Sequence, residues 1–160
     1  MTKSLFESGI GHVVIARFKA SGETEVGVFL VDAKCLGVKN AFFTRVSFAE
    51  YQKKVLERVF PYPDDQEAMA PACGRKLVED AIKYARGFGL EPHSDCREAQ
   101  RVFGGIDAAT CDRQFTFGNG GKPHYNQGPN DSDAFAARVM TQLERRCGSG
   151  GFTYTIVGDM

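Results

Sequence analysis

The sequence of 160 residues carries no net charge, because 20 lysine and arginine residues balance 20 aspartate and glutamate residues. This balance argues against a protein that coats nucleic acid or adsorbs to an anionic membrane, although a local basic patch is compatible with it. The sequence also has no apolar run near the roughly 18 residues that a membrane span needs. It lacks the apolar core and cleavage site of a signal peptide. We therefore expect a cytoplasmic protein without a membrane partner, and we disfavour nucleic acid as a partner without excluding it.

Cysteine motifs are missing as well. The five cysteines are odd in number and widely scattered, and no CxxC pair occurs among them. That absence excludes the spacing of a zinc knuckle or of a thioredoxin-type redox site. The simplest interpretation is that they are reduced thiols, most of which act as small buried hydrophobic side chains: Cys35, Cys73, Cys96, Cys111 and Cys147.

The composition that remains is that of an ordinary globular protein, with 42% hydrophobic and 25% charged residues. A chain of this length typically forms one domain and buries about two-thirds of its unfolded surface. The chain contains no internal repeat and no convincing linker. We therefore expect residues 1–160 to form a single domain.

Three apolar segments predict strands near the N-terminus, at residues 12–18, 25–32 and 38–44. A glycine-containing turn between the first two predicts a hairpin. The middle segment has four consecutive apolar residues, from Val28 to Val31, so the alternation of a half-buried strand is lost there. We expect this strand to be covered on both faces and to belong to the central strand pair of the sheet.

The clearest helix start lies at Ser47 and Glu50, whose spacing matches a capping box. Apolar residues then recur every three or four positions until the helix ends before Pro61. Three later segments also combine helical periodicity with residues that start helices: 64–88, in which Pro71 marks a break or the true start, 94–103 with Ser94 as its cap, and 133–147.

The remaining segments predict strands. Asn119 and Gly120 are the strongest local hairpin signal in the chain and predict pairing between residues 115–117 and 122–126. Residues 152–157 alternate apolar residues with threonine, which predicts a last, half-buried strand. The order β-β-β-α-α-α-β-β-α-β predicts an α+β fold with a mixed, mainly antiparallel sheet packed against helices.

Three longer segments occur in a recognisable order: GVFLVDAKCLGVKNAFF (27–43), YARGFGLEPHSDCREAQRVFGGID (84–107) and FTFGNGGKPHYNQGPNDS (115–132). Together they resemble a family of small, uncharacterised bacterial proteins. That family has a GVFLVDxxCLGVKxAF segment, which an EPHxD turn and a KPxYxxGPxD loop follow. The resemblance covers most of the chain and implies a shared fold, but it carries no activity to transfer.

The first candidate catalytic set is Asp32, Cys35 and Lys39, because an acid, a thiol and an amine fall together at the end of a buried strand. A nearby lysine or helix N-terminus can lower the pKa of a thiol and make it a nucleophilic thiolate. The alternative interpretation is structural: Asp32 caps a turn, Cys35 packs in the core and Lys39 is solvated. No Cys-His motif of a known protease class surrounds them.

A second candidate site combines two polar loops, EPHSD and KPHYNQGPNDSD. Imidazole and carboxylate ligands from the two loops could bind a divalent metal, and metal-bound water could then attack an ester or phosphodiester. The predicted metal ligands are His93, Asp95 and His124, with Asp131 and Asp133 close by in sequence. Neither an HExxH motif nor an EF-hand loop is present, and helix capping accounts for much of this composition.

The second of these loops also supplies a set of predicted binding residues: Lys122, His124, Tyr125, Asn126 and Asp131. The glycine-rich segment 118–122 just before it ends in a lysine. It lacks the pattern of a phosphate-binding loop, so we interpret it as a tight turn. Basic and aromatic residues interleave elsewhere without an RNP-like or helix-turn-helix signature.

Taken together, these patterns favour a binding or accessory module that acts through protein–protein contact and has no cofactor. The first alternative is a metal-dependent hydrolase, with nucleases included, that uses Asp32 with the His93/Asp95 and His124/Asp131 loops and a divalent metal. The second alternative is a thiol enzyme that uses Cys35, which requires an exposed and reactive thiol.

Overall fold

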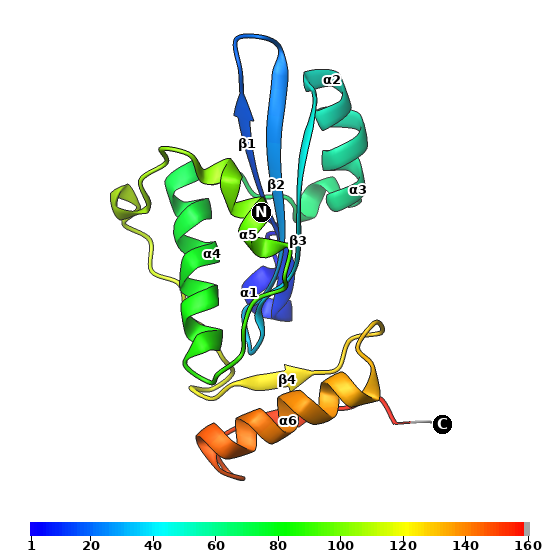
Figure 1. The fold of residues 1–160 in the computed structure, drawn as a ribbon, viewed down its shortest axis with the longest axis vertical. Coiled ribbons are helices and arrows are strands. Elements are labelled where there is room, and N and C mark those ends of the chain that lie inside the picture. Colours follow the sequence, from blue (N-terminus) through cyan, green and yellow to red (C-terminus); the bar gives the residue numbers. More distant parts are fainter. Residues whose placement is uncertain (159–160) are drawn as a thin grey trace.

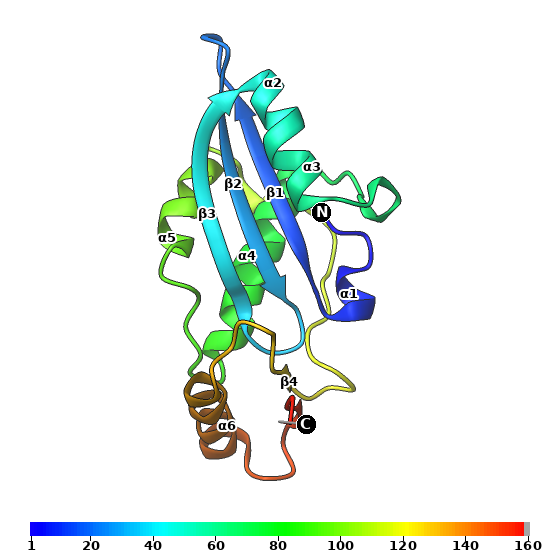
Figure 2. The same cartoon turned by 90° about the vertical axis from the view of Figure 1, so that its right-hand side faces the viewer.

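The computed structural model describes residues 1–158, and its main feature is a three-stranded antiparallel sheet (Figures 1 and 2). The strands are neighbours both in the chain and in space: β1 (Ile10–Phe18), β2 (Glu23–Asp32) and β3 (Gly37–Ser47). β2 pairs along its length with both neighbours and is therefore central, as predicted. Helices pack on this sheet, and the predicted α+β class is confirmed.

The helix after the sheet begins as its sequence predicts. The Ser47 side chain accepts a hydrogen bond from the Glu50 amide, and the Glu50 side chain accepts one from the Ser47 amide, so both halves of the capping box are present. The helix that follows, which we call helix 48–59, consists of α2 (Phe48–Glu50), a π-helical turn (Tyr51–Leu56) and α3 (Glu57–Val59).

Two helices pack on the opposite face of the sheet, α4 (Pro71–Arg86) and α5 (Cys96–Ala99). Pro71 is the true start of α4, because proline suits the first helical position, where its missing N–H has no partner to lose. α5 continues as a 3₁₀ turn (Gln100–Phe103). The predicted cap by Ser94 is wrong, since Asp95 occupies the N-cap position and its side chain makes no capping hydrogen bond.

Three of the four residues in the apolar run of β2 are buried, and they lie on both faces of the sheet, whereas Leu30 is only partly buried. Phe29 and Val31 are fully buried in the core with α4 and α5, whereas Val26 and Val28 pack against helix 48–59. Successive strand side chains point to opposite faces, so a continuous apolar run supplies both layers. Figure 2 shows helix 48–59 in front of the sheet and α4 behind it.

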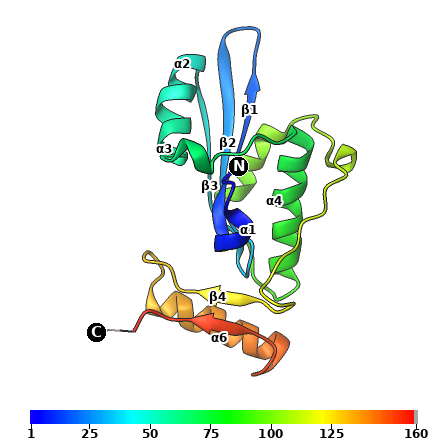
Figure 3. The same cartoon turned by 180° about the vertical axis from the view of Figure 1, so that it is seen from behind.

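The C-terminal region differs from its prediction. α6 (Asp133–Cys147) forms over the predicted residues, and Ser132 is its N-cap. However, β4 (His124–Asn126) pairs in parallel with β5 (Thr153–Thr155) instead of forming the predicted hairpin. The structure thus has two sheets, not one mixed sheet, and β5 is exposed, not half-buried. Figure 3 shows β4, β5 and α6 lying together across one end of the main sheet.

The hairpin fails because long-range packing outweighs the local turn signal. Residues 111–117 have no regular secondary structure, and Asn119 makes only an isolated bridge with Lys122. The Phe115 ring stacks on Phe6 of the short helix α1 (Leu5–Ser8), with centroids 5.8 Å apart. Two aromatic rings in this segment therefore join the main core, since Phe117 also packs against it.

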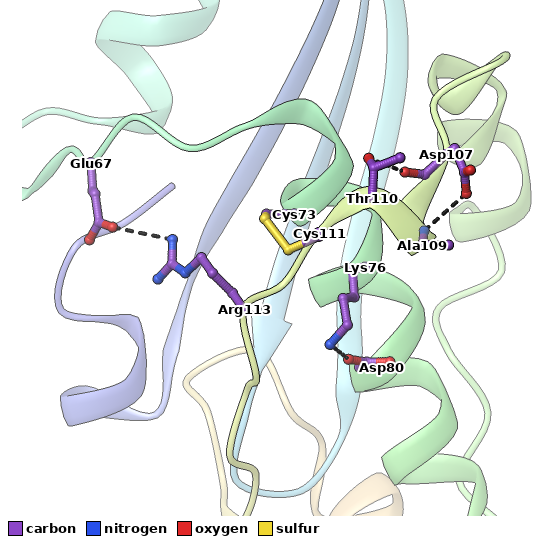
Figure 4. Close-up of a disulfide and its surroundings, with 9 residues drawn as sticks. All are labelled: Glu67, Cys73, Lys76, Asp80, Asp107, Ala109, Thr110, Cys111 and Arg113. Carbon is purple, nitrogen blue, oxygen red and sulfur yellow. Dashed lines mark hydrogen bonds and ion pairs between the residues drawn. A yellow bond between two sulfur atoms is a disulfide. The ribbon is translucent and has the colours of Figure 1, made fainter.

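The state of the cysteines also differs from the prediction. Cys73 in the first turn of α4 forms a disulfide with Cys111, 38 residues further along the chain, so the expectation of reduced thiols is wrong for this pair (Figure 4). The Arg113–Glu67 ion pair lies beside it, at 3.4 Å. Spacing alone could not reveal the bond, because it depends on the return of a loop across α4. The other three cysteines are free.

Between residues 1 and 158, none of the helices is long and apolar enough to cross a membrane.

Candidate functional site

Asp32, the last residue of β2, is bound by the turn that follows it. Its carboxylate accepts hydrogen bonds from the amides of Lys34, Cys35 and Leu36, at 2.9, 3.1 and 3.1 Å. Burial raises the pKa of this carboxyl, while the three N–H groups and Lys39 oppose that shift. The side chain thus holds the β2–β3 turn, as the structural alternative proposed, and its oxygens are occupied by backbone donors.

Cys35 is fully buried in the cluster that joins the turn to α6. Burial raises the pKa of its thiol, and the negative charge of Asp32 raises it further. The thiol is therefore protonated at neutral pH and out of reach of solvent. Since a nucleophilic cysteine must be accessible and ionisable, the hypothesis of a thiol enzyme based on Cys35 is wrong.

Lys39 is displaced from the regular ladder by a β-bulge. The register shifts so that Leu30 pairs with Asn40 and Val31 pairs with Val38, which leaves Lys39 as the extra residue. A bulge redirects its side chain, and bulges are common beside functional sites. Here the Lys39 ammonium reaches the C-terminal region and forms an ion pair with Asp131, at 2.9 Å.

Asp131 is the centre of a small network that attaches the loop 126–131 to this bulge. Besides the Lys39 ammonium, the Tyr125 hydroxyl donates to its carboxylate at 3.0 Å and the Gly128 amide donates at 2.9 Å. Burial alone would raise the pKa of Asp131, but these donors lower it overall. Tyr125 is fully buried, and burial followed by the hydrogen bond to Asp131 raises its pKa. Two predicted binding residues, Tyr125 and Asp131, thus have structural partners.

The predicted metal ligands do not come together. His93 accepts a hydrogen bond from the Asp95 amide through Nδ1, at 3.1 Å, whereas His124 Nδ1 lies 2.7 Å from the Thr153 hydroxyl. Within residues 1–158, no three His, Cys, Asp or Glu side chains gather closely enough to hold a metal ion. The metal set His93, Asp95 and His124 is therefore wrong, and the hydrolase alternative loses its metal centre.

A cavity of about 400 Å³ nevertheless gathers other predicted residues between the end of β2 and the loop 126–130. We call it the junction cavity. Four of the predicted site residues line it: Asp32, Lys39, His124 and Asn126. Gln127 also lines it, and its buried Oε1 has no hydrogen-bond partner among residues 1–158. Lys122, in contrast, is not part of this lining and donates to the carbonyl oxygen of Gly150 at 2.8 Å.

The junction cavity is continuous with a part of the sheet that helix 48–59 leaves uncovered. This surface, which we call the open face, lies between the helix and the loop 126–130 (Figure 2). Two further hollows, of about 60 and 550 Å³, share residues along it. Strand pairing places its side chains on one face of the sheet: Ile10, His12, Leu30, Asn40 and Phe42.

Basic side chains surround the open face. Lys34 and Lys39 line the junction cavity, and Lys54 and Arg58 line the hollow of about 550 Å³ beside helix 48–59. Asp32 is the only acidic residue that lines these hollows in the part of the chain that the structure describes, and it is held by backbone amides. Burial lowers the pKa of His12, which lies on the floor. The surface thus combines apolar side chains, with His12 and Asn40 between them, and a positive border.

The sequence reasoning missed this face. A signal was present, because helix 48–59 is only about 18 Å long whereas the 11 residues of β3 extend about 36 Å. A helix of that length cannot cover the whole strand. Strand alternation then assigns Leu30 and Phe42 to the same side of the sheet as Val28, which packs against the helix.

A scan against protein-family models finds no match, and no curated protein and no solved structure matches the chain significantly.

Proposed function

We propose that this protein is a binding module that holds an acidic, partly apolar segment of another protein on its open face. The observation that supports this proposal is an uncovered apolar floor with basic side chains above and below it and no free carboxylate among its lining residues. The partner would supply apolar anchors to the floor and carboxylates to the border.

The apolar anchors would contact Phe42 and Ile10. Their exposed fractions are 46% and 42%, which is high for large apolar side chains that neighbour a core. Exposed apolar side chains with a polar border are typical of protein–protein contact sites. Leu30 lies on the same face of the strand between them, where His12 and Asn40 pair with it on either side.

The carboxylates of the partner would meet Lys34 and Arg58, which have no ion-pair partner among residues 1–158. Lys54 is 72% exposed and has only a 3.5 Å contact with Glu50. The stem of Lys34 lies over Gly9, whose added Cβ would come within 2.5 Å of it, so this lysine is held beside the junction cavity. Complementary charge would set the orientation and the association rate of the partner more than its final affinity.

The experiment is selection of short peptides that contain Phe, Ile, Asp and Glu, alongside a matched pool in which Lys and Arg replace the acids. We expect the acidic pool to give binders and the basic pool to give none. Lys34→Glu combined with Arg58→Glu should weaken the best binder by at least about tenfold.

The matched control is Lys83→Glu combined with Arg97→Glu, which makes the same charge change on α4 and α5, behind the sheet. This control should leave the affinity within about twofold. Equal loss of affinity in both double variants, or binders from the basic pool alone, would contradict the proposal.

A further inference from the structure

A second cavity shares Lys39 with the junction cavity but no other lining residue with the open face. Its volume is about 410 Å³, within the range of roughly 300–1,000 Å³ that is typical of small-molecule sites. It lies between the β3 bulge, the segment 89–93 and α6. Here the main core meets a second buried cluster, which we call the C-terminal cluster: Cys35, Leu36, Tyr125, Ala136, Val139, Leu143 and Phe152. Small-molecule sites often form at such junctions.

The floor of this cavity is apolar. Five aliphatic or aromatic side chains from three separate segments line it: Leu36, Val38, Leu90, Phe135 and Val139. Leu36 and Val139 are buried parts of the C-terminal cluster, and Leu90 and Phe135 pack against that cluster. The floor is thus formed by apolar side chains that pack with the C-terminal cluster, which suits a hydrocarbon chain or ring.

The polar border of the cavity is basic. Arg138 lies over the Phe135 ring at 5.8 Å and has no ion-pair partner among residues 1–158. Lys39 lines the same cavity, and its ammonium has three hydrogens, of which Asp131 engages one. The one acidic lining residue, Glu91, is already bound to Arg86 at 3.0 Å.

His93 adds a neutral donor to this border. Its Nδ1 accepts the Asp95 amide hydrogen, so the neutral ring carries its proton on Nε2. The lining therefore offers two cationic donors and one neutral donor, and its single carboxylate, Glu91, is ion-paired with Arg86. A ligand that fits must combine an apolar body with one anionic head.

We propose that this second cavity binds a medium-chain monocarboxylate, with its hydrocarbon chain on the apolar floor and its carboxylate at Arg138, Lys39 and His93. Guanidinium and carboxylate groups match each other in a two-hydrogen-bond geometry, which favours a carboxylate head over a neutral one. Apart from Lys39, this site shares no lining residue with the open face. The proposed function rests on Lys34 and Arg58, so occupation of the second cavity does not depend on it.

The experiment is calorimetric titration of the full chain with octanoate, with 1-octanol as the neutral probe of the same length. We expect octanoate to bind at least about tenfold more tightly than 1-octanol. Arg138→Met, which keeps an unbranched side chain but removes the charge, should weaken octanoate binding by about tenfold and leave 1-octanol unchanged.

Arg145→Met is the matched control, since it removes the same charge from an exposed position of α6 that does not line this cavity. It should leave octanoate binding unchanged. Absence of octanoate binding at millimolar concentration, equal affinity for 1-octanol, or equal loss in both arginine variants would overturn the proposal.

Discussion

The two ends of β2 each bury a carboxylate, and the two carboxylates are satisfied in different ways. Glu25 and Asp32 are 5% and 8% exposed. Glu25 is surrounded by cations, with Lys19 and Arg17 each at 2.7 Å and Arg45 at 3.3 Å. Asp32 is satisfied by three backbone amides instead.

This difference determines which end of the sheet has basic side chains that are available to a binding partner. At the Glu25 end, the carboxylate engages the nearby basic side chains, and the ion-pair cluster closes that end. At the Asp32 end, the backbone satisfies the acid, so Lys34 has no ion-pair partner among residues 1–158 and Lys39 is free to reach Asp131. A buried acid held by amides thus leaves a positive border next to the open face.

The largest expected effect comes from removal of the Asp32 carboxylate. Asp32→Ala leaves three turn amides without an acceptor, of which those of Cys35 and Leu36 are buried, and should lower the free energy of unfolding by about 3 kcal/mol. Asp32→Asn retains one acceptor oxygen and should cost less than half as much. Urea unfolding followed by circular dichroism measures both. A loss below about 0.5 kcal/mol in Asp32→Ala would show that the amides are satisfied in another way.

Acidification should change the contributions of the two carboxylates to folding stability in opposite directions, with a smaller effect than the loss of the Asp32 side chain. The Lys19 hydrogen bond, followed by those from Arg17 and Arg45, lowers the pKa of Glu25 to about 2 from an ordinary 4.5. Its contribution to stability is therefore complete above pH 4.5 and is lost as the pH falls toward about 2. Asp32 should affect stability in the opposite direction, because its pKa is raised in the folded state above the ordinary 3.8. The folded state then binds this proton more tightly than the unfolded chain, so protonation of Asp32 on acidification favours folding.

Thermal unfolding of Glu25→Gln and Asp32→Asn between pH 6 and pH 2.5 tests this difference in sign. Glu25→Gln should lose less stability on acidification than the unmodified protein, and Asp32→Asn should lose more. Identical acid profiles for the two variants would contradict the contrast between the two ends.

Local sequence patterns predicted the parts of the fold that depend on local physics. Ser47 with Glu50 caps its helix as expected, because this cap involves only residues within one turn. The burial of Val28, Phe29 and Val31 on the two faces of β2 followed from its unbroken apolar run, whereas Leu30 is only partly buried. Asp32 and Lys39 were recognised as members of one region, although their partners, three amides and Asp131, could not be read from sequence spacing.

The predictions that failed depended on contacts between distant residues. The Cys73–Cys111 bond and the parallel pairing of β4 with β5 join residues that lie 38 and 29 positions apart. The bulge that redirects Lys39 depends on the register between two strands, which neither strand encodes alone. The open face was missed because it depends on how much of the sheet helix 48–59 leaves uncovered, and this is set by the packing of the helix on the strands.

The measurement that tests the central claim most directly is a backbone amide NMR titration of the full chain with the best acidic peptide from the selection. We predict that the shifted amides lie on the open face, at residues 10–12, 30–34 and 40–42, and that the amides around Glu25 do not move. Shifts confined to α4, α6 or the Glu25 end would contradict the assignment of the open face as the partner-binding surface.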